Sequence, residues 1–239
     1  MPWWHGYGAA VTAPELPENV DTVVLDVDGT LVDTVYRHTV LWAEAFAELG
    51  VDVPMWKLHR AVGMGGDRFV TEVAGEEVEK QHGDAVRKVH DERFDEVIDE
   101  IRPLPGASAL LDELDRRGLN VVLASSGIKS QTERLIAIVG GDEKSQGWTS
   151  SDDVESSKPS PDLIEAAIAK VDGTRSVVVG DAIWDVEAAR KAGLYSIGLL
   201  CGGFGEDELR RTGAGLVFET PQDLLDHLDE TPLRPRRTG

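Results

Sequence analysis

The chain has 239 residues, of which 28 % are charged and 41 % are hydrophobic, and this composition suits one or two globular domains. It excludes collagenous, fibrous and disordered classes of protein. Asp and Glu total 44 against 24 Lys and Arg, and the resulting net charge of −20 repels nucleic-acid backbones and anionic membrane surfaces. We therefore expect neither a nucleic-acid partner nor a membrane partner.

The cysteine content and the beginning of the chain bear on its cellular location. Cys201 is the single cysteine, so no disulfide framework can form. The first residues carry no basic segment followed by an apolar run of signal-peptide length, and no stretch of about 18 uncharged apolar residues occurs. We expect a cytoplasmic protein that is a monomer or a weak homodimer.

The two ends of the chain differ in composition from the middle. Residues 1–20 are rich in Gly, Pro and aromatic residues without periodicity, and we interpret them as an N-terminal extension. Residues 229–239 are interpreted as a C-terminal tail of the same kind. Both segments are predicted to pack loosely or to lack order.

Between these ends, short apolar runs rich in β-branched residues alternate with helix signals. The runs have the length and composition of buried strands and cover residues 22–28, 120–126, 176–181, 195–200 and 215–218. Strands that alternate with helices at this spacing indicate right-handed crossovers and a parallel sheet covered on both faces. The fold class is therefore predicted to be α/β, with a Rossmann-like core.

Several helix boundaries can be predicted from capping residues. Ser130 with Glu133 forms a capping-box pattern, whereas Ser160 and Thr220 each precede a proline and are expected to be N-caps. Gly118 and Gly193 stand where glycines commonly end a helix.

Residues 34–102 interrupt the alternation with a series of helical patterns. Apolar side chains at Val40, Leu41, Ala45, Phe46 and Leu49 form one helical stripe, and residues 84–101 are highly charged. Hinge-like sequences border the interval at residues 33–34 and 102–106. We predict an all-helical cap domain over residues 34–102, inserted into a core made of residues 21–33 and 103–228.

Polar residues follow the predicted strands, at the edge of a parallel sheet where ligands bind. Asp26 and Asp28 point to the same side of an extended chain, and two carboxylates that close repel each other by about 4 kcal/mol at an effective dielectric constant of about 20. A Mg²⁺ ion would offset this repulsion. An Asp-x-Asp pair by itself is equally compatible with a turn or a solvated acid pair. Further candidates at strand ends or in the loops between them are Ser125, Ser126, Gly127, Lys158, Asp181 and Asp185.

Four of these segments together resemble the ordered motifs of the haloacid dehalogenase superfamily. They are DVDGTLVDT at residues 26–34, Ser125, the Lys158-Pro159 pair and GDAIWD at residues 180–185. The resemblance covers residues 21–228 and extends to the subfamily with a helical cap between the first two motifs, as in phosphoglycolate phosphatase and β-phosphoglucomutase. Four motifs in order at strand ends make this signal highly specific.

The resemblance implies a role for each acidic residue. Asp26 is expected to be the nucleophile that forms an aspartyl-phosphate, and Asp28 the general acid and then the general base. The carboxylates of Asp26 and Asp181 and the carbonyl of Asp28 are expected to bind Mg²⁺. Asp185 is expected to hold a metal-bound water or Lys158.

Phosphoryl transfer needs hydrogen-bond donors around the phosphate oxygens, which here must overcome an acidic net charge. Lys158 would supply a cation and Ser125 a hydroxyl group. Backbone N–H groups near Gly29, Ser126 and Gly127 would complete the phosphate site, because small residues allow close approach.

The predicted cap offers candidates for substrate binding. His38 follows the hinge residue Thr34 and resembles a histidine that supports the acid/base aspartate in β-phosphoglucomutase relatives, although a surface histidine is the alternative. Residues 57–68 contain the glycines and cations of a specificity loop that faces the core, or else of simple helix connectors. We expect Thr34 at the hinge and Gly65 and Arg68 in this loop to contact substrate, with Arg68 binding a second anionic group.

These observations favour a Mg²⁺-dependent phosphatase that hydrolyses a small phosphorylated metabolite, such as a phosphoglycolate-like compound or a sugar phosphate. Asp28 argues against dehalogenase and phosphonoacetaldehyde hydrolase activity, because members of the superfamily with those activities lack the second carboxylate. A phosphosugar mutase is the alternative, but the spacing of Arg60 and Arg68 from the glycines departs from the mutase pattern. A receiver-type domain is about half as long and has no lid, and a non-catalytic phosphate-binding module would not need every motif residue intact.

Overall fold

The computed structural model describes residues 15–234 and is built on a six-stranded parallel sheet with the strand order β3-β2-β1-β4-β5-β6. All five strand pairs are parallel, and Thr22 at the start of β1 lies between Asn120 of β2 and Ser176 of β4. The strands are β1 (Thr22–Asp26), β2 (Asn120–Ala124), β3 (Gly147–Thr149), β4 (Ser176–Gly180), β5 (Tyr195–Leu199) and β6 (Leu216–Phe218). The predicted α/β class with a Rossmann-like parallel sheet is confirmed.

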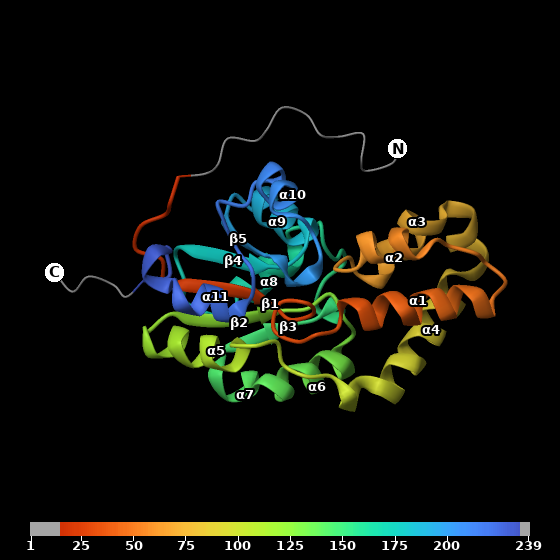
Figure 1. The fold of residues 1–239 in the computed structure, drawn as a ribbon, viewed down its shortest axis with the longest axis horizontal. Helices are drawn as coiled ribbons and strands as arrows, with labels where there is room; N and C mark the ends of the chain where they lie inside the picture. Colours follow the sequence, from red (N-terminus) through yellow and green to blue (C-terminus); the bar gives the residue numbers. More distant parts are fainter. Residues whose placement is uncertain (1–14, 235–239) are drawn as a thin grey trace.

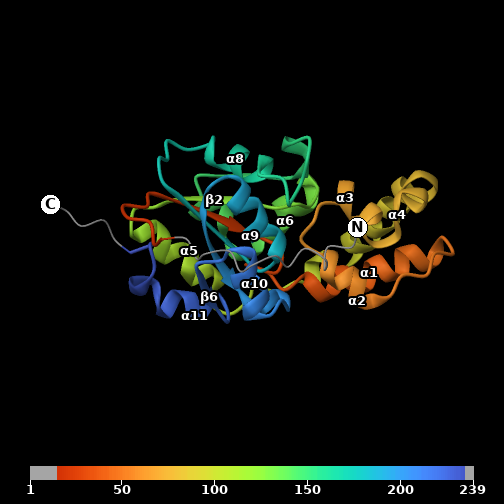
Figure 2. The ribbon, with the colours of Figure 1, turned by 90° about the horizontal axis from the view of Figure 1, so that it is seen from above.

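Helices cover both faces of the sheet because side chains alternate along each buried strand. Val23 and Leu25 of β1 belong to a cluster with residues of α5 (Ala107–Arg116), α6 (Lys129–Val139) and α11 (Pro221–Asp226). Val24 points to the other face, where α8 (Asp162–Ile168) and α9 (Ile183–Lys191) pack. Figure 2 shows α8 and α11 on opposite sides of the strands.

A helical unit follows β1 and stands at one end of the molecule, beside the sheet (Figures 1 and 2). It has its own hydrophobic cluster, which includes Trp42, Phe46, Leu58, Phe69 and Val86. Where the unit leaves and rejoins the core, the Asp33 N–H donates to the Arg102 carbonyl at 3.0 Å. Its helices are α1 (Val35–Glu48), α2 (Met55–Ala61), α3 (Gly66–Ala74), α4 (Glu76–Val97) and the 3₁₀ helix η2 (Ile98–Glu100). The predicted all-helical insertion is confirmed as part of the fold class.

Short helices complete the core. They are α7 (Gly141–Lys144), α10 (Glu206–Thr212), η3 (Ser151–Asp153), η4 (Leu200–Gly202) and η5 (Leu228–Glu230). The predicted boundary at Thr220 is confirmed, since its hydroxyl accepts the Asp223 N–H at 3.2 Å. Gly118 and Gly193 follow α5 and α9 with φ angles of 74° and 71°, as glycines that end helices do.

Other local predictions are wrong. Helix α6 begins at Lys129 after Ile128, so Ser130 lies inside the first turn and forms no capping box. Pro161, not Ser160, immediately precedes α8, and the Ser160 hydroxyl donates to the Asp162 carboxylate instead. The strand β3 was not predicted, because three residues give no periodicity and this strand is defined by its pairing with β2.

The predicted terminal segments fall partly outside the described residues, which exclude residues 1–14 and 235–239. The prediction of a loose tail is wrong for the described part of it, because Thr231 and Leu233 are fully buried. Leu233 belongs to the main hydrophobic cluster, and the Arg117 guanidinium donates to its carbonyl at 3.4 Å. The described part of the tail therefore packs against the core through Leu233.

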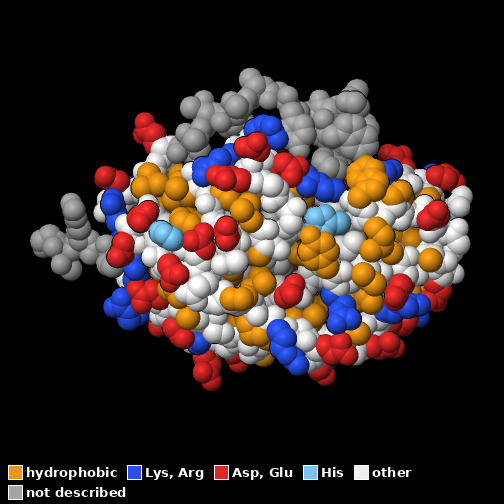
Figure 3. All heavy atoms as spheres, in the orientation of Figure 1, with side chains coloured by type: hydrophobic (Ala, Val, Ile, Leu, Met, Phe, Trp, Pro, Cys, Tyr) orange, Lys and Arg blue, Asp and Glu red, His pale blue; other side chains and the backbone are white. Residues whose placement is uncertain are grey.

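The surface of the visible face carries acidic side chains over both the sheet core and the helical unit, with Lys and Arg interspersed (Figure 3). Over the described part of the chain, none of the helices combines the length and apolar character needed to cross a membrane.

Candidate active site

Three buried aspartates meet where β1 and β4 end. Asp26 is the last residue of β1, Asp181 follows β4, and Asp185 lies in the first turn of α9. Each offers one carboxylate oxygen, and these three oxygens lie within 4.8 Å of one another. Their convergence follows from the topology, because β1 and β4 are neighbours whose carboxyl ends lie at the same edge of the sheet.

Lys158 lies between these carboxylates. Its Nζ atom pairs with Asp26 Oδ1 and lies 2.7 Å from Asp185 Oδ1. Burial lowers the pKa of the Lys158 ammonium, but the two carboxylates outweigh burial and hold that pKa above its usual value. Lys158 is therefore a fixed cation beside Asp26.

One buried lysine does not compensate three carboxylates. Burial and the nearby Asp185 and Asp28 charges raise the pKa of Asp26, Lys158 lowers it, and the net result is a pKa of about 7. The pKa of Asp181 is also raised, first by burial and then by Asp26 and Asp185. A hard divalent cation fits this set, since it would stabilise all three ionised carboxylates with the oxygen ligands that Mg²⁺ prefers.

Glycines allow the backbone to approach the Asp181 carboxylate. A Cβ atom on Gly202 would lie 1.9 Å from Asp181 Oδ2, and one on Gly29 would lie 2.4 Å from the same oxygen. Gly29 also has a φ of 81°, which favours glycine. The Thr30 hydroxyl donates to Asp181 Oδ1 at 2.8 Å, so this carboxylate is held in a narrow slot.

Asp28 has a different environment, rich in donors. Its carboxylate accepts the Ser125 hydroxyl at 2.9 Å and the Thr34 hydroxyl at 3.0 Å, and His38 Nε2 lies 3.2 Å away. Burial raises the pKa of Asp28, but the hydrogen bonds from His38, Ser125 and Thr34 outweigh burial and lower the pKa overall. Asp26 and Asp28 thus have pKa values shifted in opposite directions, which is the pattern of groups with separate acid/base roles.

Two residues that sequence reasoning missed extend this arrangement. His90 Nε2 lies 3.1 Å from His38 Nδ1, and Asp91 Oδ1 lies 3.0 Å from His90 Nδ1. The His90 ring is stacked on Trp42 with 3.8 Å between ring centroids, and burial lowers its pKa to about 4. His90, itself a neutral ring, therefore fixes the orientation of the His38 ring. The only sequence signal was the spacing of apolar residues around it in the charged segment that forms α4.

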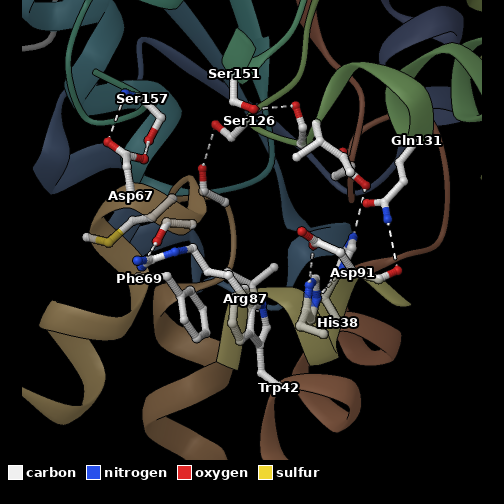
Figure 4. A pocket seen from close by; sticks show the side chains of 18 of the residues that line it. His38, Trp42, Asp67, Phe69, Arg87, Asp91, Ser126, Gln131, Ser151 and Ser157 are labelled. Atoms are coloured by element: carbon white, nitrogen blue, oxygen red, sulfur yellow. Dashed lines mark hydrogen bonds and ion pairs between the residues drawn. The ribbon is translucent and has the colours of Figure 1, made fainter. Parts of the chain in front are cut away.

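A cavity of about 550 Å³ opens between the cap and the core beside Asp26 and Asp28. Figure 4 shows side chains from the cap, such as Trp42 and Arg87, facing core residues such as Ser126 and Gln131. Three residues that are expected to contact substrate or phosphate line this cavity: His38, Ser126 and Gly127. Ser125 does not line it, but its hydroxyl donates to Asp28, which does.

The cap loop at residues 63–66 contacts the core directly. The Gly65 N–H donates to Ser157 Oγ at 3.0 Å, and the Ser126 hydroxyl donates to the Gly63 carbonyl at 3.2 Å. The Ser157 hydroxyl in turn bonds the Asp67 carboxylate. Gly65 therefore lies at the junction of cap and core and does not line the cavity. Gly29 and Thr34 do not line the cavity either. Gly29 lies close to the Asp181 carboxylate, and the Thr34 hydroxyl donates to Asp28.

The expectation for Arg68 requires correction. Its side chain is 45 % exposed, its Nε atom faces Asp67 Oδ2 at 3.8 Å, and it does not line the cavity. The guanidinium that does line the cavity belongs to Arg87 on α4. The direction of a side chain on α3 depends on how the helix packs, which the spacing from the loop glycines cannot determine.

Comparison with known proteins agrees with this geometry. The model of the haloacid dehalogenase-like hydrolase family matches residues 20–193, and a second model of HAD-like hydrolases matches residues 156–231. A phosphonoacetaldehyde hydrolase from Bordetella avium is 30 % identical, with 99 % of this chain and 87 % of that protein covered. A phosphoglycolate phosphatase from Caulobacter vibrioides is 27 % identical, with 86 % and 90 % covered.

Solved structures agree as well. A hydrolase from Pseudomonas syringae superimposes with a TM-score of 0.83 and 36 % identity, covering 87 % of this chain and 98 % of that one. A β-phosphoglucomutase from Clostridium difficile shares the fold with a TM-score of 0.77 and 18 % identity, covering 89 % and 97 %. On the family match, the strand-end aspartates and the helical cap, the chain belongs to the haloacid dehalogenase-like hydrolases.

Proposed function

We propose that this enzyme is a Mg²⁺-dependent phosphatase that hydrolyses a small phosphomonoester through an aspartyl-phosphate on Asp26. The observation that carries the proposal is the pairing of two differently held aspartates at one cavity. Asp26 lies against Lys158 and two further carboxylates, whereas Asp28 is held by three side-chain donors. One carboxylate is suited to attack phosphorus and the other to move a proton.

The carboxylates of Asp26, Asp181 and Asp185 are the candidates to hold the metal ion. When bound, Mg²⁺ supplies positive charge that lowers the repulsion between the nucleophile and a phosphate dianion. Lys158 adds a second positive charge to the same place from the protein itself. These local charges are what allow an anionic substrate to approach a protein with a net charge of −20.

In the first step, an Asp26 carboxylate oxygen attacks phosphorus, and the bond between phosphorus and the ester oxygen breaks. The Asp28 carboxyl group gives its proton to the departing alkoxide, and the neutral alcohol leaves. Thr34, Ser125 and His38 hold Asp28 in place for this transfer. Asp28 is then an ionised carboxylate.

In the second step, Asp28 takes a proton from a water molecule as the water oxygen attacks phosphorus. The bond between phosphorus and the Asp26 oxygen breaks, so inorganic phosphate leaves and Asp26 returns to its carboxylate form. Asp28 is protonated again and ready for the next ester. The lowered pKa of Asp28 keeps its carboxylate in the ionised form, which is the form that can accept this proton.

A phosphonate substrate is the first alternative, because a relative that is 30 % identical is named phosphonoacetaldehyde hydrolase. The presence of Asp28 favours an ester, since an alkoxide leaving group needs a proton. A mutase is the second alternative. It must hold a second phosphate group during the reaction, and within the described residues Arg87 is the one Lys or Arg side chain that lines the cavity.

The test is hydrolysis of p-nitrophenyl phosphate and of a panel of phosphorylated metabolites, with Mg²⁺ and with excess EDTA. We expect phosphate release that stops in EDTA and returns when Mg²⁺ is restored. Undiminished activity in EDTA would contradict the metal-dependent mechanism. Cleavage of phosphonoacetaldehyde without ester hydrolysis would establish the first alternative, and isomerisation that requires a sugar bisphosphate primer would establish the second.

A further inference from the structure

We propose that the alcohol part of the substrate carries hydroxyl or ammonium groups and no second anionic group. This proposal rests on the phosphatase function and concerns the part of the cavity beyond the phosphate. It differs from the expectation of a phosphoglycolate-like ester, whose leaving group bears a carboxylate. Three features of the cavity support it. The wall carries carboxylates, the Arg87 guanidinium is already paired, and the rest of the wall combines apolar side chains with hydrogen-bond acceptors.

The charged groups in the wall beyond Asp26 and Asp28 are mostly carboxylates. Asp67 enters from the start of α3, Asp91 from α4, and Glu155 from the loop before Lys158. They therefore come from three separate segments, on both the cap and the core sides of the cavity. A carboxylate on the leaving group would therefore meet like charge from each side.

Arg87 does not reverse this balance, because its charge is already compensated. Its two terminal nitrogens bond the Glu79 carboxylate at 2.9 and 2.7 Å, and Nη2 also bonds Asp84 at 2.8 Å. Nη1 donates in addition to the Gly66 carbonyl at 3.0 Å. A ligand carboxylate would have to displace these partners, so Arg87 shapes the wall and is not available as an anion receptor.

His90 and His38 do not supply a second cation site either. Burial lowers the pKa of His90 to about 4, so its ring is neutral at pH 7. The Nε2 atom of His38 faces Asp28 and its Nδ1 atom faces His90, so both ring nitrogens are engaged. Lys158 is engaged too, beside the nucleophile, where the phosphate itself would bind.

The remaining wall accepts a compact polar group beside an apolar surface. Trp42, Val62, Met64 and Phe69 form the apolar part on the cap side. Carboxylate oxygens of Asp91 and Glu155 and the side-chain oxygen of Gln131 offer acceptors, which are complementary to O–H and N–H donors. Polyhydroxy alcohols and amino alcohols share this donor-rich character, and the experiment below separates them.

The experiment uses three two-carbon phosphate esters that differ only at the far end: 2-phosphoglycolate, 2-hydroxyethyl phosphate and phosphoethanolamine. We expect kcat/KM for at least one donor-bearing ester to exceed that for 2-phosphoglycolate by tenfold or more. A larger value for 2-hydroxyethyl phosphate assigns the site to hydroxylated substrates, and a larger value for phosphoethanolamine assigns it to amino alcohols. A three-carbon pair, glycerol 3-phosphate against 3-phosphoglycerate, repeats the comparison for a longer leaving group.

Glu155→Gln tests whether the wall charge causes the discrimination. Glu155 is exposed at the cavity rim, so its replacement leaves the core intact, and it should raise the rate on 2-phosphoglycolate several-fold relative to 2-hydroxyethyl phosphate. Glu72→Gln is the matched control, because Glu72 is exposed on α3 and does not line the cavity. It removes the same charge and should leave the ratio unchanged.

Equal or faster hydrolysis of the carboxylated esters would overturn the proposal, as would a ratio that moves identically in Glu155→Gln and Glu72→Gln. Failure of the phosphatase function has a different signature. In that case p-nitrophenyl phosphate and all five esters would remain intact, and no preference could be measured.

Discussion

At the scale of single residues, the two aspartates after β1 differ in their partners, although they lie two positions apart. Asp26 contacts Lys158 and lies near Asp181 and Asp185, and its pKa is raised to about 7 in the absence of a further cation. Asp28 is surrounded by neutral donors and His38, and its pKa is lowered. Replacement of Asp26 and of Asp28 by asparagine should therefore affect turnover in different ways.

Asp26→Asn should abolish turnover of every phosphate ester, because the amide cannot attack phosphorus. We expect a fall in kcat of at least about 10³-fold, with the thermal unfolding temperature unchanged or raised, since the substitution removes one of three buried carboxylates that repel each other. Phosphate release and differential scanning calorimetry measure the two effects. Residual turnover near the wild-type rate would show that another group is the nucleophile.

Asp28→Asn should slow alkyl phosphates more than aryl phosphates, because a p-nitrophenolate leaves without a proton and an alkoxide does not. We expect the rate of the first step to fall about 10²- to 10⁴-fold for an alkyl ester and much less for p-nitrophenyl phosphate. Burst kinetics with the aryl ester would separate formation of the aspartyl-phosphate from its hydrolysis. Equal losses in both first steps would indicate that Asp28 has a structural role.

At the scale of elements, the start of β1 depends on one side chain. The Asp21 carboxylate accepts the Thr174 N–H at 2.9 Å, the Arg175 N–H at 3.1 Å and the hydroxyl of Thr22 at 2.8 Å. It thereby ties β1 to the loop before β4. Burial raises the pKa of Asp21, but these hydrogen bonds outweigh burial and lower the pKa to about 2.

Asp21→Ala should lower the free energy of unfolding by about 1.5 to 3 kcal/mol at pH 7, the range for hydrogen bonds to a charged group. Because the folded-state pKa is below the usual value of 3.8, this contribution is present above pH 4 and is lost as the pH falls toward 2. Urea unfolding at pH 7 and at lower pH measures it. Asp172→Ala, at an exposed position in the same loop, is the control, and an equal loss in both variants would contradict the anchoring role.

Helix α4 shows how one element serves two purposes. Val86 is buried in the hydrophobic cluster of the cap and Phe94 in that of the core, whereas Arg87, His90 and Asp91 line the cavity. The helix is followed by η2, next to the segment that returns the chain to the core. Movement of the cap would therefore carry His90 and Asp91 with it relative to Asp28.

At the scale of the whole molecule, the cap is held on the core by contacts that lie away from the nucleophile. The Arg60 guanidinium forms two hydrogen bonds with Glu208 of α10, at 2.6 and 3.1 Å, and lies 4.1 Å from the Phe204 ring centroid. Trp184 donates from Nε1 to the Arg60 carbonyl at 3.1 Å. Closure of the cap would exclude water from the cavity and strengthen the electrostatic interactions in it.

Arg60→Ala should favour the open cap and lower kcat/KM for a small alkyl phosphate by about 5- to 30-fold, which corresponds to about 1 to 2 kcal/mol for a charge-assisted pair. Small-angle X-ray scattering should show a larger radius of gyration. Arg93→Ala is the control, because Arg93 pairs with Glu44 and Glu48 inside the cap. An unchanged radius and unchanged kinetics in Arg60→Ala would mean that this pair does not govern closure.

The sequence by itself predicted the α/β core, the helical insertion and the position of the acidic residues at strand ends. These features depend on local patterns: β-branched runs of strand length, helical stripes and short motifs that directly follow a strand. Because neighbouring parallel strands end at one edge of the sheet, their sequence positions alone predict that Asp26, Asp28 and Asp181 lie together. Their roles in catalysis remain predictions for the variants above.

The tertiary structure alone decided which cap residues face the core. Arg68 was predicted to reach the substrate, yet Arg87 lines the cavity and is paired with Glu79 and Asp84. His90 and Asp91 lie in a segment whose charge hid their contact with His38. The physical reason is that helix rotation and the crossing of α1 by α4 depend on packing among residues distant in sequence, whereas strand-end motifs are positioned by the strand that precedes them.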